Sequence, residues 1–187
     1  MSNVLIVSGH SDLNDSVANK EILERLSQLL PQAQIDYLDR LYPNYQIDVA
    51  AEQAKLEWAD IIVLQFPIFW YAMPSLLTRW IETVFIHGFA HGSRGRQLQG
   101  KKLVASFTSG APAELFQRQA LGFEIEDLLL PLKGCCKLCG LDFAGFIYTG
   151  GVSYQLRVDP QKLTLIKEKA QEHAQRLVEL ISRLNIQ

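Results

Sequence analysis

The chain has 187 residues, of which 48% are hydrophobic and 20% are charged, a globular composition that excludes an intrinsically disordered protein. Its formal net charge of −2 offers no basic surface for nucleic acid, so no nucleic-acid partner is expected. No apolar stretch is long enough to span a bilayer, and no charged, then apolar leader opens the chain. Three cysteines, an odd number, suit a reducing compartment better than a disulfide framework. We expect a cytoplasmic protein with a single domain over residues 1–187.

Strand-like and helix-like segments alternate along the chain. Apolar runs bounded by turn residues predict strands, and apolar residues at three- and four-residue spacing predict helices. The predicted strands are 3–8, 35–38, 61–64, 102–108 and 143–148. The predicted helices are 15–30, 49–58, 74–85, a helical region within 113–139, and a long last helix over 160–184.

This alternation implies a parallel sheet with right-handed crossovers. The predicted fold class is α/β: a flavodoxin-like, doubly wound five-stranded parallel sheet in the strand order 2-1-3-4-5, with helices on both faces. In that order, the loops after strands one, three and four converge at one edge of the sheet, where open α/β sheets bind ligands.

The segment from Gln65 to Pro74, after the third strand, is the most informative part of the chain. It contains four aromatic residues within six positions, and its backbone is restrained by Pro67 and Pro74. Pro74 fits the first position of the following helix, where its missing N–H costs nothing. An aromatic loop at the carboxyl end of a strand suits a large flat ring system.

The loops after strands one and four carry weaker signals. Ser16 and Asn19 lie at a helix start, where N–H groups and hydroxyls either hold a phosphate or form an ordinary cap, and the cap is favoured on this loop alone. Asp12 and Asp15 oppose a phosphate unless their carboxylates point to solvent. His10 offers a donor or, when protonated, a compensating charge. The loop 108–111 is either a routine turn or a set of backbone donors for the polar edge of a ring.

The ranges 66–77, 80–85 and 88–92 resemble the NAD(P)H:quinone oxidoreductase family of flavodoxin-like flavoproteins. The resemblance runs from the first strand to the last helix. It is nearest to the bacterial branch that includes ancillary flavoproteins of glutathione-gated potassium efflux systems, which 42–43 and 47–53 resemble in particular. It implies a homodimer that reduces quinones by two electrons.

The resemblance implies a set of cofactor-binding residues. Contacts to the flavin phosphate and ribityl chain fall on His10, Ser16, Val17, Ala18 and Asn19. Contacts to the isoalloxazine fall on Ile68, Phe69, Trp70 and Tyr71 after strand three, and on Thr108, Ser109, Gly110 and Ala111 after strand four.

Two departures from the family pattern affect the chemistry. The usual Thr-Thr-Gly-Gly is Thr-Ser-Gly-Ala at 108–111, which adds a methyl group near the flavin. The family's tyrosine falls on Phe116, and no histidine occurs between His91 and His173, so no catalytic side chain is assigned. Phe116 and Phe89 are candidate walls of the slot in which a substrate ring stacks.

The leading hypothesis is a flavin-dependent NAD(P)H dehydrogenase (quinone) type of oxidoreductase, with FMN favoured and FAD as the alternative. It passes two electrons from NAD(P)H to a quinone-like acceptor. The alternative is a regulatory flavin-binding subunit of a potassium efflux antiporter, which would bring the protein to the inner face of the membrane. A one-electron carrier of the flavodoxin type fits poorly, because such carriers are strongly acidic. Homodimerisation is predicted from aromatic and apolar residues around one helix end: Trp80, Phe85, Ile86 and Phe89.

Several other residues of types that can carry chemistry are expected to have ordinary structural roles. The cysteines 135, 136 and 139 lie late in a helical pattern and are expected to be small core residues. His87 and His91 have metal-ligand spacing, but adjacent glycines and the lack of an acidic partner favour no metal. Arg94 and Arg96, expected near the site, either meet the 2′-phosphate of NADPH or are solvated, and solvation is favoured.

Overall fold

The computed structural model describes residues 2–185. The strands are β1 Val4–Ser8, β2 Gln34–Tyr37, β3 Ile61–Pro67, β4 Lys102–Thr108 and β5 Asp142–Thr149. The α-helices are α1 Ala18–Leu29, α2 Leu38–Leu41, α3 Val49–Trp58, α4 Ser75–Val84, α5 Arg118–Leu121, α6 Leu130–Cys139 and α7 Pro160–Leu184. Short 3₁₀ helices cover Leu13–Asp15, Ala113–Leu115, Ile125–Leu129 and Tyr154–Val158.

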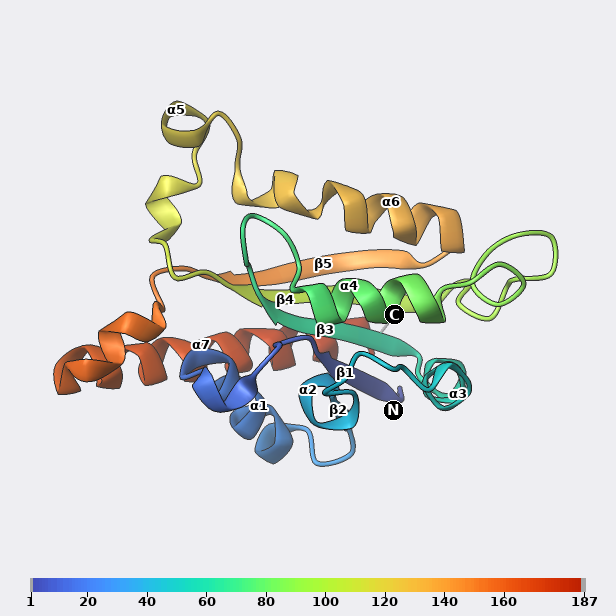
Figure 1. The fold of residues 1–187 in the computed structure, drawn as a ribbon, viewed down its shortest axis with the longest axis horizontal. Coiled ribbons are helices and arrows are strands. Elements are labelled where there is room, and N and C mark those ends of the chain that lie inside the picture. Colours follow the sequence, from blue (N-terminus) through green and yellow to red (C-terminus); the bar gives the residue numbers. More distant parts are fainter. Residues whose placement is uncertain (1, 186–187) are drawn as a thin grey trace.

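The strands form one parallel sheet in the order β2-β1-β3-β4-β5, which confirms the predicted fold class and strand order. Side chains of a strand alternate between the two faces of the sheet. In β1, Leu5 and Val7 pack in the core that contains α3, α4 and α6, whereas Val4 and Ile6 pack in the core that contains α1 and α7. Figure 1 shows these helices on opposite sides of the sheet. Both faces of the sheet are therefore buried, as the continuous apolar runs indicate.

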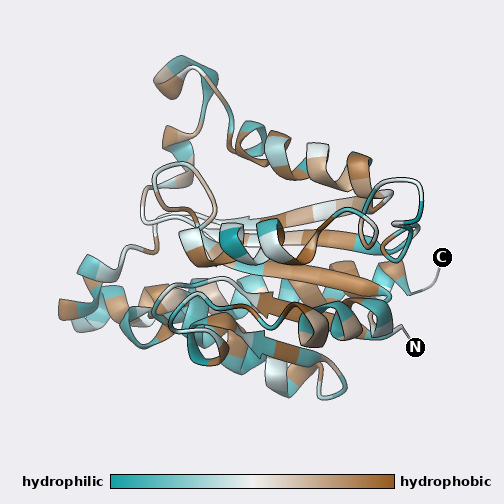
Figure 2. Ribbon diagram, turned by 45° about the vertical axis from the view of Figure 1, so that its right-hand side comes forward, coloured by the Kyte–Doolittle hydropathy of each residue, from teal (hydrophilic) through white to brown (hydrophobic). Residues whose placement is uncertain are grey.

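Hydropathy follows the same layering. The central strands are mostly brown in Figure 2, whereas the helices alternate between brown and teal along their length. A helix at the surface buries one stripe and hydrates the other, so this alternation is what the helical spacing of apolar residues predicts.

Most element boundaries agree with the sequence, and the differences have local causes. β3 continues to Pro67 because Phe66 and Pro67 pair with the end of β4. Pro74 caps α4 instead of occupying its first helical position, since its ψ of 150° is extended. The first helix begins only at Ala18, because Ser16 has extended backbone angles after the 3₁₀ turn. α2 was not predicted, and Leu38, assigned to a strand, is its first residue.

The residues from which dimerisation was predicted are mainly internal. Trp80 is fully buried, and Phe85 and Phe89 are 8% and 7% exposed, whereas Ile86 is 44% exposed. The prediction of an exposed aromatic patch at this helix end is therefore wrong. The apolar face of α4 and the residues after it pack into the core of the same chain.

Candidate functional site

The three loops selected from the sequence meet at the carboxyl edge of the sheet around two adjoining cavities. One has a volume of about 410 Å³ and the other of about 280 Å³, and both are lined by Ile68 and Gly110. The larger cavity is lined by His10, Asp15, Ser16, Val17, Ala18, Asn19, Pro67, Ile68, Phe69, Thr108, Gly110, Val152, Ser153 and Tyr154. The smaller is lined by Ile68, Trp70, Tyr71, Ser109, Gly110, Ala111, Leu115, Phe116 and Leu121. Every predicted cofactor-binding residue lines one of the two.

The larger cavity ends at the start of α1. The Ser16 hydroxyl accepts the N–H of Asn19 at 3.1 Å, which is an ordinary capping bond. Within residues 2–185, the N–H groups of Val17 and Ala18 have no recorded acceptor and remain for an anion. Asp15, which opposed a phosphate on sequence grounds, forms an ion pair with Arg157 at 2.6 Å. The negative charge at this end of the cavity is thereby compensated.

His10 enters the same cavity from the loop after β1. Its Nδ1 accepts the N–H of Asp12 at 3.1 Å, so a neutral ring carries its proton on Nε2. Burial lowers the pKa of His10, against the opposing effect of Asp39, Asp12 and Asp15. The structure therefore favours a neutral donor over a compensating cation. The loop passes close to α4, because a Cβ on Gly9 would lie 2.6 Å from the Leu77 side chain.

The aromatic loop forms a tight turn. Phe69 and Ala72 exchange two backbone hydrogen bonds of 3.0 Å, which places Trp70 and Tyr71 at the tip. These two residues have φ values of 49° and 63°, a left-handed conformation that costs a non-glycine residue roughly 1–2 kcal/mol. Trp70 is 95% exposed and Tyr71 is 51% exposed. The turn thus holds aromatic rings at the mouth of the smaller cavity instead of in the core.

The loop after β4 supplies backbone donors. Within the described residues, the N–H groups of Gly110 and Ala111 have no recorded acceptor. The Ser109 hydroxyl donates to Ala111 O at 2.7 Å and accepts from the Tyr148 hydroxyl at 2.7 Å. Phe116 packs edge-on against Tyr148, with ring centroids 6.0 Å apart. N–H donors and an aromatic wall therefore face the smaller cavity, as a planar ring with polar edges requires.

Sequence reasoning missed the loop after β5. Val152, Ser153 and Tyr154 close the larger cavity from the side opposite β3. The available signal was the pair Gly150 and Gly151 directly after the last strand, at the same edge of the sheet. Gln65 was also missed: it is 1% exposed and hydrogen-bonded to Asn19 at 2.8 Å.

The structure separates Phe89 from the other predicted residues. α4 begins at the carboxyl edge and returns the chain toward the amino edge, because ten residues span about 15 Å. Phe89 follows α4 and is buried in the core, and it lines neither cavity. Arg94 and Arg96 belong to the same loop, between α4 and β4, which lies at the end of the sheet opposite α5 in Figure 1. Neither arginine lines either of the two cavities.

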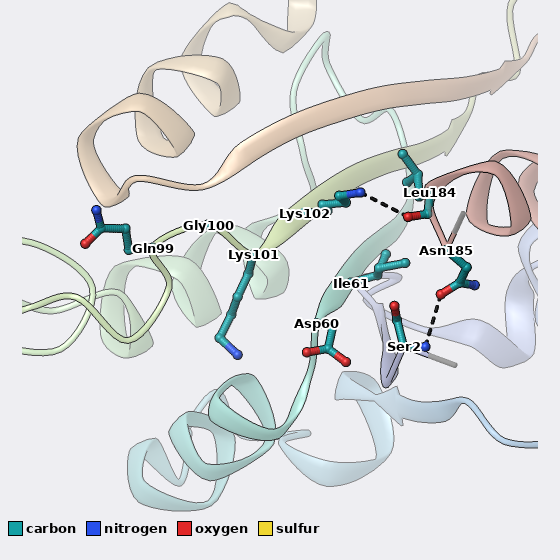
Figure 3. Close-up of a pocket in the computed structure, with 9 residues that line it drawn as sticks. All are labelled: Ser2, Asp60, Ile61, Gln99, Gly100, Lys101, Lys102, Leu184 and Asn185. Atoms are coloured by element: carbon teal, nitrogen blue, oxygen red, sulfur yellow. Dashed lines mark hydrogen bonds between the residues drawn. The ribbon is translucent and has the colours of Figure 1, made fainter. Parts of the chain in front are cut away.

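A third cavity, separate from this pair and about 650 Å³ in volume, lies at the amino edge of the sheet (Figure 3). Lys102 donates to Leu184 O at 3.0 Å, and Lys101 donates to the carbonyls of Glu57 and Ala59 at 2.8 and 2.5 Å. Both ammonium groups therefore donate hydrogen bonds to backbone carbonyls at the ends of neighbouring helices. Within residues 2–185, none of the residues that line this cavity is aromatic; they come from turns, from the starts of β3 and β4, and from the end of α7.

Within residues 2–185, no helix is long and apolar enough to cross a membrane. Over the same residues, no group of three or more His, Cys, Asp or Glu side chains is placed to hold a metal ion.

The fold and the cleft at its carboxyl edge define a flavodoxin-like protein. The family model described as flavodoxin-like fold matches residues 2–177, and the chain belongs to this family.

Solved structures show the same architecture. General stress protein 14 of Treponema denticola, solved in complex with FMN, is 28% identical over 95% of this chain and 99% of that chain, with a TM-score of 0.84. A chain in the crystal structure of thermophilic tryptophan halogenase from Streptomycin violaceusniger is 28% identical over 90% and 96%, with a TM-score of 0.79. An NADPH-quinone reductase from P. pentosaceus is 24% identical over 93% and 98%, with a TM-score of 0.74, which shows a shared fold.

Proposed function

We propose that this protein is an FMN-dependent NAD(P)H oxidoreductase that passes two electrons to a quinone-like acceptor. The observation that carries the proposal is the pair of adjoining cavities, since one end offers N–H and hydroxyl groups and the other offers aromatic walls. A flavin mononucleotide has this polarity, with a phosphate at one end and a flat ring at the other. The FMN bound to the Treponema relative supports the choice of cofactor.

The residues of the larger cavity fit the phosphate and ribityl end. The Val17 and Ala18 N–H groups at the start of α1 would bind the phosphate, which the helix N-terminus favours. His10 would donate from Nε2 without adding a full charge. Asn19 and Thr108, both buried at the floor of the cavity, would contact the ribityl hydroxyls.

The residues of the smaller cavity fit the ring. Trp70, Tyr71 and Phe116 would shape the slot in which the ring and a second flat molecule stack. The N–H groups of Gly110 and Ala111 would stabilise negative charge on the polar edge of the ring. The flavin, when bound, supplies the redox chemistry, and the protein orients the nicotinamide and the acceptor in turn. The acceptor is proposed to be quinone-like because of the quinone reductase among the structural relatives.

Titration tests the cofactor. Apoprotein is titrated with FMN and with FAD while flavin fluorescence is followed, and we expect saturable binding with one FMN per chain and weaker binding of FAD. Anaerobic mixing of the loaded protein with NADH or NADPH then tests the donor, and addition of a benzoquinone tests the acceptor. If neither FMN nor FAD binds to the apoprotein, the proposed function is wrong.

A regulatory role is the second candidate function, and the presence of a phenylalanine at position 116 favours it. Where the resembling family has a tyrosine, this wall of the smaller cavity carries no hydroxyl. If flavin-loaded protein is reduced by neither nicotinamide, a flavin-binding subunit of a potassium efflux antiporter explains the cleft better. Co-purification with such an antiporter would support that role.

We also propose that the protein forms a homodimer. The exposed aromatic residues lie at the mouth of the smaller cavity, and exposed apolar clusters of this kind mark interfaces.

A further inference from the structure

A continuous chain of hydrogen bonds runs through the core below the larger cavity. It runs from α7 to the end of β5 and back to α7, then through β4 and β3 to α1, and it returns to the end of β4. We call it the buried relay, and its members in order are Arg176, Thr149, His173, Ser106, Gln65, Asn19 and Thr108. All of them except Arg176 are less than 9% exposed. Buried polar networks of this size are retained where every member is satisfied.

The part of the relay nearest the cavity has a defined direction. The Ser106 hydroxyl donates to Gln65 Oε1 at 2.5 Å. The amide of Gln65 donates to Asn19 Oδ1 at 2.8 Å, and the amide of Asn19 donates to Thr108 Oγ1 at 3.0 Å. Each side chain thus accepts on one side and donates on the other, toward the cavity.

His173 continues the same direction toward the surface. Because the Ser106 hydroxyl donates its hydrogen bond to Gln65, its oxygen accepts from His173 Nε2 at 2.7 Å. A neutral imidazole then accepts at Nδ1, so the Thr149 hydroxyl donates to it at 2.9 Å. Thr149 in turn accepts from the guanidinium of Arg176 at 2.7 Å. Burial, followed by the nearby Arg176 charge, lowers the pKa of His173 to about 3, which keeps the ring neutral.

The relay leaves one proton unassigned at its end. Thr108 accepts from Asn19, and within residues 2–185 no acceptor is recorded for its own hydroxyl proton. Thr108 is 2% exposed and lines the larger cavity. The direction of the relay therefore leaves Thr108 as a donor toward the cavity.

We propose that the buried relay is a positioning device, with His173 at its centre, that presents the Thr108 hydroxyl as a hydrogen-bond donor to an oxygen atom of the bound ligand. The identity of the ligand rests on the proposed flavin function, in which a ribityl hydroxyl or a ring carbonyl oxygen would accept this proton. His173 acts through Ser106, Gln65 and Asn19 and does not line the cavity.

The direction of the relay is tested first in the ligand-free protein. Nitrogen-15 NMR of the imidazoles distinguishes the two neutral tautomers, and the spectrum of His173→Gln identifies the signals of His173. We expect His173 protonated on Nε2 and neutral down to pH 5, with this tautomeric preference lost in Ser106→Ala. A proton on Nδ1, or a cationic ring at neutral pH, overturns the relay whether or not the protein binds flavin.

The effect on the ligand is tested by a double-mutant cycle with FMN as the probe. Loss of one hydrogen bond costs about 1 kcal/mol, so Ser106→Ala and Thr108→Val should each raise the dissociation constant of FMN roughly five- to tenfold. Because Ser106 acts through Thr108, the double variant should bind no more weakly than Thr108→Val alone. Additive losses contradict the proposal.

A matched control separates positioning from stability. Leu177→Ala removes a fully buried side chain one turn beyond His173 on α7 and breaks no relay bond. We expect it to lower the melting temperature at least as much as Ser106→Ala while leaving FMN affinity unchanged. His173→Gln, which retains a donor and an acceptor, should bind FMN within about twofold of the parent, whereas His173→Leu should resemble Ser106→Ala. If Leu177→Ala weakens FMN binding equally, the relay has only a structural role.

Failure of the parent to bind FMN removes the proposed function, and the tautomer of His173 then decides the relay by itself.

Discussion

His10 and His173 both have a lowered pKa, and burial is the main cause for each ring. Their surroundings nevertheless give them different roles. His10 faces three carboxylates, Asp39, Asp12 and Asp15, which partly oppose the effect of burial, and it lines the larger cavity. Within residues 2–185, no carboxylate contributes to the pKa of His173, which bonds to two hydroxyls. The first ring is therefore placed to meet a ligand, and the second to hold other side chains.

The stability of the protein should depend on pH through His173. Its pKa is about 3 in the folded state and near the ordinary value of 6.5 in the unfolded chain, so between these values the unfolded chain binds the extra proton. The free energy of unfolding is therefore highest above pH 6.5 and falls as the pH is lowered toward 3. Between pH 7.5 and 5.5 the loss due to this residue should be about 1.4 kcal/mol. Urea unfolding at both pH values measures it.

The variant His173→Gln is the control for that experiment, because it cannot titrate. It should lose about 1.4 kcal/mol less than the parent over the same interval. Equal losses would show that His173 does not contribute, since every other titrating group, His10 included, is present in both proteins.

Phe116 is the residue at which the wall of the smaller cavity can be altered most directly. Its ring packs edge-on against Tyr148 and lies at the cavity surface. Phe116→Ala should weaken stacking by about 1 kcal/mol and raise the apparent dissociation constant of the nicotinamide about fivefold. Phe116→Tyr should preserve the fold and speed reduction of the flavin by adding a hydroxyl. Anaerobic stopped-flow absorbance measures both variants.

Leu138→Ala serves as a control, because this exposed residue of α6 lines neither cavity. We expect it to match the parent in both rate and affinity. An unchanged reduction rate in Phe116→Tyr would show that the backbone N–H groups of Gly110 and Ala111 already suffice.

At the scale of elements, the side of the fold next to β2 is held by a buried carboxylate. Glu52 of α3 is fully buried and accepts from Tyr42 at 2.8 Å, from Lys55 at 2.6 Å and from Trp80 of α4 at 2.7 Å. Lys55 also bonds to Asp36 of β2 at 2.8 Å. Burial, and then the hydrogen bond to Glu52, raise the pKa of Tyr42, which keeps its hydroxyl as a donor. One carboxylate thus links two helices and, through Lys55, an edge strand.

Glu52→Gln should destabilise the protein strongly. The amide would direct an N–H group at another donor, and an unsatisfied buried donor costs about 1–3 kcal/mol. Lys55 would keep its ion pair with Asp36 but lose its bond to a second carboxylate. Glu57→Gln, an exposed change on the same helix, should cost less than about 0.5 kcal/mol. Thermal unfolding followed by circular dichroism compares them. Similar melting temperatures for the two variants would mean that the network carries little of the stability.

At the scale of the whole molecule, the exposed aromatic turn 69–72 is the surface on which we expect a second copy to dock. Trp70 is 95% exposed and lies beside Leu115 and Leu121 around the smaller cavity, and both leucines are also exposed. Sedimentation velocity at micromolar concentration should show a dimer for the parent and a monomer for Trp70→Ser. Trp58→Ser, which removes a tryptophan that is 40% exposed on α3, should remain dimeric. A parent that sediments as a monomer and still binds FMN tightly would refute the dimer.

Local sequence patterns determined most of the elements and the loops that line the two cavities. Apolar periodicity placed α3, β4 and α7 at their observed bounds, and the alternation of strands and helices implied the parallel sheet that the structure contains. The three loops that line the cavities were found because the carboxyl ends of neighbouring parallel strands must meet at one edge. These signals need only neighbours along the chain or the rules of strand connection.

Contacts between distant residues were decided by the tertiary structure. Gln65, Ser106, His173 and Thr149 are hydrogen-bonded across separations of 41, 67 and 24 residues, and no local pattern distinguishes them from ordinary core positions. The burial of Trp80 and Phe89 and the exposure of Trp70 likewise depend on which surfaces the packed helices cover. Periodicity indicates which face of a helix or strand is apolar. Only the packing of all the elements determines which residues contact that face.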